Sequence, residues 1–107
     1  MKKVQVHRVK HITGLLNVYD VVVNYSSGVE ERYPIKNNET ITIEVIDQDC
    51  YLSVWYHPYG DIRYPLCDAF LVKAEDKDKS LIFDRTVKGL NVTKVFLIEK
   101  PVTEQPR

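Results

Sequence analysis

The chain has few glycines, and the sequence motifs that depend on glycine are missing from it. Only four glycines occur in 107 residues, and none belongs to a P-loop, a dinucleotide-binding fingerprint or the GxSxG elbow of a serine hydrolase. The sequence therefore offers no phosphate-binding loop and no strained turn that exposes a nucleophile. We expect a protein that is not an enzyme, with no catalytic residue and no cofactor.

The chain also lacks an excess of charge of either sign. Fifteen basic and fifteen acidic residues cancel, and the two signs alternate in segments such as GVEERYPIKNNE at 28–39. A neutral chain has no long-range field that attracts phosphate backbones or anionic membranes. Nucleic acid is therefore a disfavoured partner.

Long apolar runs are absent as well. No stretch approaches the roughly 18 consecutive apolar residues of a membrane-spanning helix. The N-terminal MKKVQVHRVK alternates apolar with polar residues, whereas a signal peptide has a continuous apolar core. We therefore expect a cytoplasmic protein with no membrane contact, on the assumption that no leader peptide has been removed.

Cysteine is scarce, with Cys50 and Cys67 the two in the chain. In the hairpin register derived below, they point to opposite sides of one sheet, whereas a disulfide needs Cβ atoms about 3.8 Å apart. We expect two free thiols, as is usual in a reducing compartment. A cysteine-dependent enzyme stays open as an alternative, because Cys67 and His57 or His7 need only be adjacent in space.

Patterns typical of metal ligands are incomplete. DKDKS at 76–80 begins like a calcium loop, but Leu81 replaces the required glycine and Val87 replaces the bidentate acid. His7 and His11 could share one face of a strand, yet no HExxH or CxxC pattern completes a zinc site. We expect no metal site.

The sequence is rich in β-branched and aromatic residues that alternate with polar ones. TITIEV at 40–45 is the clearest example, and alanine, the best helix former, occurs only twice. The alternation predicts strands at 2–9, 16–25, 29–36, 40–46, 50–57, 61–66, 69–74, 80–87 and 92–99. A polar tail follows at 101–107.

This pattern predicts one antiparallel β-sandwich over residues 1–100, with an Ig-like architecture. The alternative fold is a small OB-like barrel with one short helix near 69–77, where Asp68 could cap CDAFLVKAEDK. Three-residue hairpin loops are expected at SSG 26–28 and at PYG 58–60, each with its glycine in the left-handed conformation. Asparagines in KNN at 36–38 also tolerate positive φ.

The PYG loop sets the register of the hairpin 51–67. The pairs that follow are His57–Asp61, Tyr56–Ile62, Val54–Tyr64 and Leu52–Leu66. This register puts the apolar residues of the last three pairs on the core side. Trp55 then lies on the opposite face, directly across from Arg63, where a cation–π stack could form.

The same hairpin contains the candidate binding residues. Tyr, Trp and Arg are enriched where one protein grips another, and aromatic rings also stack on sugars and unpaired bases. The candidates are Tyr51, Trp55, His57, Tyr59, Asp61 and Arg63. A competing interpretation is purely structural, because cross-strand aromatic pairs are common in sheets.

We therefore expect a binding or interaction module whose partner is a protein, including a second copy of the chain. Open edges of a sandwich also invite β-augmentation. The alternatives are a carbohydrate-binding module that uses the same aromatics, a binder of single-stranded nucleic acid, and the thiol enzyme described above.

Overall fold

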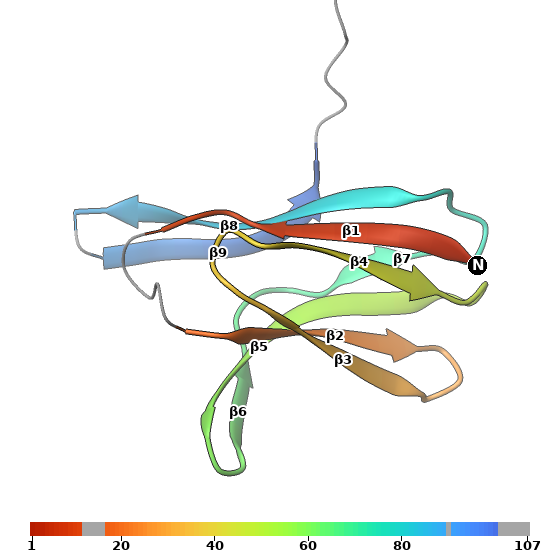
Figure 1. Cartoon of the computed structure of the whole chain (residues 1–107), viewed down its shortest axis with the longest axis horizontal. Coiled ribbons are helices and arrows are strands. Elements are labelled where there is room, and N and C mark those ends of the chain that lie inside the picture. The colour runs from red at the N-terminus through yellow and green to blue at the C-terminus, as the bar shows by residue number, and fades with distance from the viewer. Residues whose placement is uncertain (12–16, 90, 101–107) are drawn as a thin grey trace, which may run out of the picture.

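The described residues form nine strands in two packed sheets (Figure 1). The described residues of this computed structural model are 1–11, 17–89 and 91–100, without the side chains of 59, 87, 91 and 93. The strands are β1 (Lys2–Arg8), β2 (Tyr19–Tyr25), β3 (Glu30–Ile35), β4 (Thr40–Val45), β5 (Cys50–Tyr59), β6 (Ile62–Pro65), β7 (Phe70–Val72), β8 (Lys79–Lys88) and β9 (Asn91–Glu99). The predicted all-β sandwich is confirmed. Residue 16 and the tail at 101–107 lie outside the described residues.

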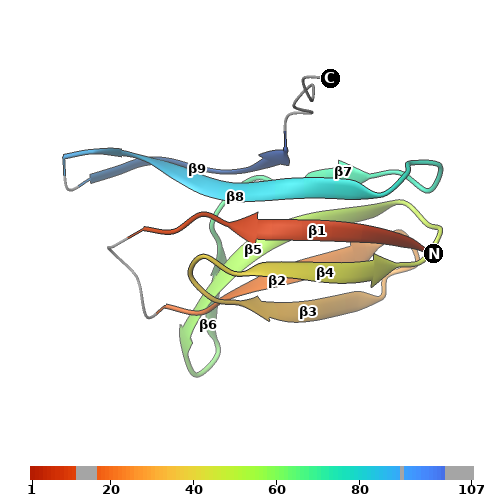
Figure 2. The same ribbon diagram turned by 45° about the horizontal axis from the view of Figure 1, so that its top comes forward.

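One sheet has the strand order β4-β1-β8-β9, and the other has the order β3-β2-β5-β6, with β7 also paired to β5. Neighbouring strands run antiparallel except β1 and β8, which are parallel. In the part of the chain that the structure describes, both sheets end in open edges and do not close on each other, as Figure 2 shows, so the OB-like barrel is wrong. The helix near 69–77 is wrong too, because that stretch holds strand β7 and a turn, and the described residues contain no helix.

The core lies between the two sheets and follows the alternation read from the sequence. In TITIEV, Ile43 and Val45 are buried while the threonines and Glu44 are exposed. Buried side chains from the inner faces include Val4, Val6, Ile43, Val45 and Leu81 from one sheet and Val21, Val23, Leu52, Val54 and Val72 from the other. Burying a valine or leucine side chain contributes roughly 1.5–3 kcal/mol, so this core is the main source of stability.

Two of the predicted turns form as expected. Gly28 has a φ of 94°, its N–H donates to the carbonyl of Tyr25, and the N–H of Tyr25 donates to the carbonyl of Val29. These bonds close the three-residue loop SSG between β2 and β3. Asn38 has a φ of 62° between β3 and β4, as the KNN segment predicts.

Candidate interaction surface

The turn that joins β5 to β6 differs from the predicted PYG loop. Tyr59 pairs with Ile62, so the loop has two residues, Gly60 and Asp61. Gly60 opens this turn with a φ of 59°, the first-position glycine that a two-residue hairpin favours. Nε2 of His57 donates a hydrogen bond to the carbonyl oxygen of Gly60, which braces the turn from within.

A β-bulge at His57 and Pro58 lies just before the turn in the chain. The register shifts between Tyr56 and Tyr59, and proline at this position cannot donate to the ladder. Beyond the bulge, Tyr56 pairs with Tyr64 and Trp55 with Pro65. The predicted partners of Tyr56 and Trp55 are therefore wrong by two residues.

Because the error is an even number of residues, the predicted faces of β5 survive. Leu52 and Val54 are fully buried in the core, and Trp55 lies on the other face, half-buried. The expected stack of Trp55 on Arg63 is lost with the register. Instead, Nε1 of Trp55 donates to Oγ of Ser53 at 2.9 Å, so the indole lies back along its own strand.

The predicted hairpin 51–67 is longer than the observed one, because β6 ends at Pro65. Leu66 still donates its N–H to the carbonyl of Val54 at 2.8 Å, but Leu52 pairs with Phe70 of β7. β6 and β7 are thus two halves of one edge, separated by the segment 66–69. The predicted pair Leu52–Leu66 is wrong for this reason.

A series of aromatic rings joins the hairpin to the core. The ring centroids of Phe83 and Tyr19 lie 5.8 Å apart, those of Tyr19 and Tyr56 5.5 Å, and those of Tyr56 and Tyr64 5.6 Å. All three contacts are edge to face, a geometry that contributes about 0.5–1.5 kcal/mol per pair beyond burial. The base of the hairpin is therefore held by packing as well as by its ladder.

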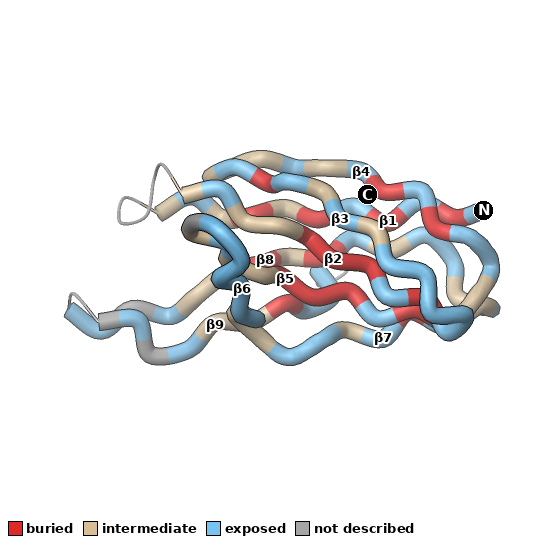
Figure 3. Tube along the Cα trace, turned by 90° about the horizontal axis from the view of Figure 1, so that it is seen from below, coloured by how far each residue is buried: buried red, intermediate tan, exposed pale blue. Residues whose placement is uncertain are grey.

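Beyond these rings the hairpin projects from the sandwich (Figures 1 and 2). All four residues of β6 are exposed, and Figure 3 shows this strand in pale blue, in contrast to the red, buried segments of β2 and β5. Ile62 and Tyr64 keep 46% and 45% of their surface in solvent. The sequence pattern assigned both residues to the core side, so it missed their exposure to solvent.

The predicted binding residues occupy three different environments. His57, Asp61 and Arg63 are exposed near the tip, and Trp55 and Tyr51 lie on the outer face of β5, half-buried and exposed respectively. The side chain of Tyr59 lies outside the described residues. The structure thus adds Ile62 and Tyr64 to the tip and separates Tyr51 and Trp55 from it.

A cleft of about 210 Å³ at one end of the sandwich also escaped the sequence analysis. Arg8, His11, Tyr19, Leu66, Phe83 and Asp84 are among the residues that line it. Nη1 of Arg8 donates to the carbonyls of Asn17 and Ile35 at 2.6 and 2.9 Å, and its guanidinium lies 3.9 Å from the ring centroid of Tyr19. Burial lowers the pKa of Arg8 from its usual value.

The other polar groups of the cleft are also engaged. Nε2 of His11 lies 2.6 Å from Oδ1 of Asp84, and Asn37 bonds to the backbone of His11 through both its amide oxygen and its amide nitrogen. These contacts connect the segment after β1 to β8 and to the β3–β4 connection. We interpret the cleft as a structural junction. One feature of the sequence pointed to this junction: Arg8 is a charged residue on the inward face of its strand, which it shares with Val4 and Val6.

The two cysteines are free, as predicted. Cys50 is buried and Cys67 half-buried, and burial raises the pKa of both thiols. An activated nucleophile requires the opposite shift. The histidines named as possible bases have other partners, since His57 bonds to Gly60 and Nδ1 of His7 lies 2.7 Å from Oγ1 of Thr40.

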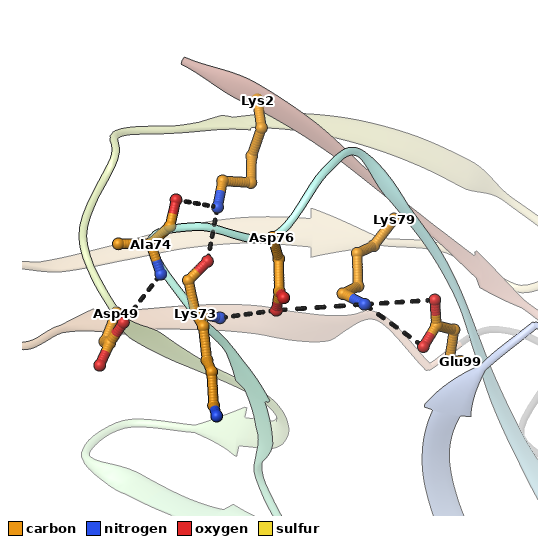
Figure 4. A network of polar contacts seen from close by, with 7 residues as sticks. All are labelled: Lys2, Asp49, Lys73, Ala74, Asp76, Lys79 and Glu99. Atoms are coloured by element: carbon orange, nitrogen blue, oxygen red, sulfur yellow. Dashed lines mark hydrogen bonds and ion pairs between the residues drawn. The ribbon is translucent and has the colours of Figure 1, made fainter.

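Charged side chains hold the β7–β8 connection, which contains Asp76 of the DKDKS segment (Figure 4). Nζ of Lys2 donates to the carbonyls of Lys73 and Ala74 at 2.6 and 2.9 Å. Asp76 accepts from the N–H of Lys73, and Asp49 accepts from that of Ala74, both at 2.8 Å. Within the described ranges, no three His, Cys, Asp or Glu side chains are grouped so that they could hold a metal ion.

No known protein family, curated protein or solved structure matches the chain. Among the described residues, no helix is long and apolar enough to cross a membrane. Over the described residues, the fold and the surface together define a two-sheet sandwich, antiparallel except for the β1–β8 pair, from which the β5–β6 hairpin projects.

Proposed function

We propose that the chain is a non-enzymatic interaction module that contacts a protein partner through the hairpin 51–67. The observation that carries this proposal is the exposure of Ile62 and Tyr64 on a strand that projects beyond the sandwich. Covering apolar surface with a partner removes it from water, and this hydrophobic contribution drives most protein–protein association.

The surroundings of these two residues suit a protein interface. His57, Asp61 and Arg63 are exposed beside them and supply groups for hydrogen bonds and ion pairs. An apolar centre with a polar rim is the usual arrangement at protein interfaces. Tyr and Arg are also among the residues that contribute most to binding energy.

The aromatic contacts below the tip support the same proposal. Because Tyr64 packs on Tyr56 and Tyr56 on Tyr19, the base of the hairpin is ordered before a partner arrives. Binding by a preformed element loses less conformational entropy than binding by a flexible loop.

A protein partner is favoured over a sugar or an unpaired base. Those ligands are held best by several flat rings that face solvent together, whereas the indole of Trp55 lies along its own strand against Ser53 and the exposed rings of Tyr51 and Tyr64 lie on different strands. Ile62, which keeps 46% of its surface in solvent, is aliphatic and offers no flat ring to a base or a sugar. The neutral chain also supplies no general attraction for phosphates.

The test is quantitative affinity purification from the native lysate with a tagged wild-type chain and two variants. One variant combines Ile62→Ser with Tyr64→Ser. The control is Val29→Ser, which removes an apolar side chain of similar exposure, 53%, in the β2–β3 connection. We expect the wild type and the control to recover the same protein and the hairpin variant to lose it. Equal recovery by all three, with circular dichroism showing each folded, would overturn the proposal.

A further inference from the structure

We infer that β9 is a dimerisation edge, at which two copies of the chain pair antiparallel and join their four-stranded sheets into one. This inference does not rest on the proposed function, because it concerns the opposite sheet from the hairpin. It starts from the way in which the edges of the two sheets differ.

The edges of the hairpin-bearing sheet carry features that block strand addition. Pro34 lies within β3 and Pro65 within β6, and β7 has only three residues. Proline on an edge and a very short edge strand both prevent pairing with another chain. In contrast, β9 has nine residues without a proline.

The backbone of β9 is oriented for such pairing. The N–H of Lys100 donates to the carbonyl of Ser80 at 2.7 Å, which makes this a hydrogen-bonded pair. Such pairs alternate along an antiparallel ladder, so the backbone groups of Phe96 and Ile98 also point toward β8. Those of Val95, Leu97 and Glu99 then point to the open side, where no strand among the described residues pairs with β9.

The two edge strands of this sheet differ on their outer faces: the outer face of β9 is apolar, and that of β4 is polar. Ile98 keeps 44% of its surface exposed, and Phe96 lies beside it, half-buried, on the same face. The side chains of β4 on the corresponding face are Thr40, Thr42 and Glu44. Of the two edges of this sheet, β9 therefore buries more apolar surface on pairing.

The sequence of β9 matches a second copy of itself in one register. The extra residue at 93 disturbs the ladder, so the regular part of the strand begins at Lys94. Pairing about Phe96 places the two Phe96 rings together, Val95 opposite Leu97 of the second copy, and Lys94 opposite its Ile98. The aliphatic stem of Lys94 can then cover that isoleucine.

The neighbouring registers are less favourable. Pairing about Leu97 brings Lys94 opposite Lys100 of the second copy, a like-charge pair that destabilises a ladder. Pairing about Val95 runs into the irregular backbone at 93. The register about Phe96 also puts this residue in a non-hydrogen-bonded pair, whose Cα atoms lie about 4.5 Å apart.

Sedimentation analysis of the full chain over a range of concentrations tests the inference. We expect the wild type to approach twice the chain mass of 12.5 kDa. Phe96→Lys and Phe96→Glu should each be monomeric, since each places two like charges together, and their mixture should restore the dimer. Phe96→Cys should form an intermolecular disulfide under mild oxidation, because the pair is close enough for one.

Two controls separate this edge from other surfaces. Thr42→Lys on β4 adds a charge to the other edge of the same sheet and should leave the dimer intact. The hairpin variant Ile62→Ser with Tyr64→Ser should also remain dimeric, which keeps this result independent of partner binding. A wild type that is monomeric at every concentration, or a Phe96→Lys variant that stays dimeric, would overturn the inference.

Discussion

The rings of Tyr56 and Tyr64 meet edge to face across β5 and β6, with centroids 5.6 Å apart and planes at 83°. Tyr56 is half-buried and Tyr64 is exposed. The pair therefore couples the projecting strand to the body of the sandwich. Together with the two-residue turn, it explains how a four-residue edge strand with every side chain exposed holds its place.

We predict that these two tyrosines are energetically coupled. A double-mutant cycle with Tyr56→Ala and Tyr64→Ala, followed by urea unfolding, should give a coupling free energy of about 0.5–1.5 kcal/mol. If the two losses of stability add within about 0.3 kcal/mol, the rings contribute only through their separate burial.

Arg8 is predicted to be structural. Arg8→Met removes the hydrogen bonds from Nη1 to the carbonyls of Asn17 and Ile35, and losing the donor to the buried Ile35 carbonyl costs about 1–3 kcal/mol. Arg8→Lys keeps the charge and a hydrogen-bond donor but loses the planar group stacked on Tyr19. We therefore expect it to lose less stability than Arg8→Met. Thermal or urea unfolding of both variants checks this order. An unchanged stability for Arg8→Met would contradict the role given to the cleft.

We predict that the protein loses stability at alkaline pH because Tyr25 and Tyr33, which bond to Glu31, ionise there. Burial and the hydrogen bond to Glu31 raise the pKa of Tyr33 to about 12, and burial raises the pKa of Tyr25 as well. Both folded-state values exceed the ordinary 10.0, so the unfolded chain ionises first as the pH rises. Their contribution is thus fully present below about pH 10 and is lost as the pH rises toward 12.

Titration of tyrosinate absorbance measures this effect directly. The wild type should show a component that ionises well above the ordinary range, and Tyr33→Phe should remove part of it. Glu31→Gln should shift the component to lower pH, because the neighbouring negative charge disfavours tyrosinate. A titration that is identical in all three proteins would contradict the assignment.

The two thiols should differ in reactivity. Cys50 is buried, and we expect it to react with a disulfide reagent only when the protein unfolds, while half-buried Cys67 reacts slowly in the folded state. Because burial raises the pKa of both thiols, the folded-state rate should still be rising above pH 9. Rapid modification of Cys67 at neutral pH would favour the thiol-enzyme alternative.

Much of the fold could be predicted because alternation is a local property of the sequence. It located the nine strands that the described residues form, and it gave the right faces to Val54 and Trp55. The hairpin register could not be predicted, because it depends on a bulge at Pro58 and on β7 taking over the edge beside Leu52. These are choices between competing pairings, which one strand's pattern does not resolve.

Alternation, being local, also explains why the sequence indicated only part of the candidate surface. The sequence pattern selected the hairpin but assigned Ile62 and Tyr64 to the core, since alternation cannot reveal where a strand runs past the sheet that faces it. The contact of Tyr56 with Tyr19 was also out of reach, because β2 and β5 are neighbours only through the sheet order.

The most direct measurement is photo-crosslinking from the hairpin in cells that express the tagged chain. A photoreactive residue replaces Tyr64 in one variant and Val29 in the other. We predict a discrete adduct with one partner protein from position 64 and none from position 29. The same adducts from both positions, or none from position 64, would contradict the assignment of the hairpin as the contact surface.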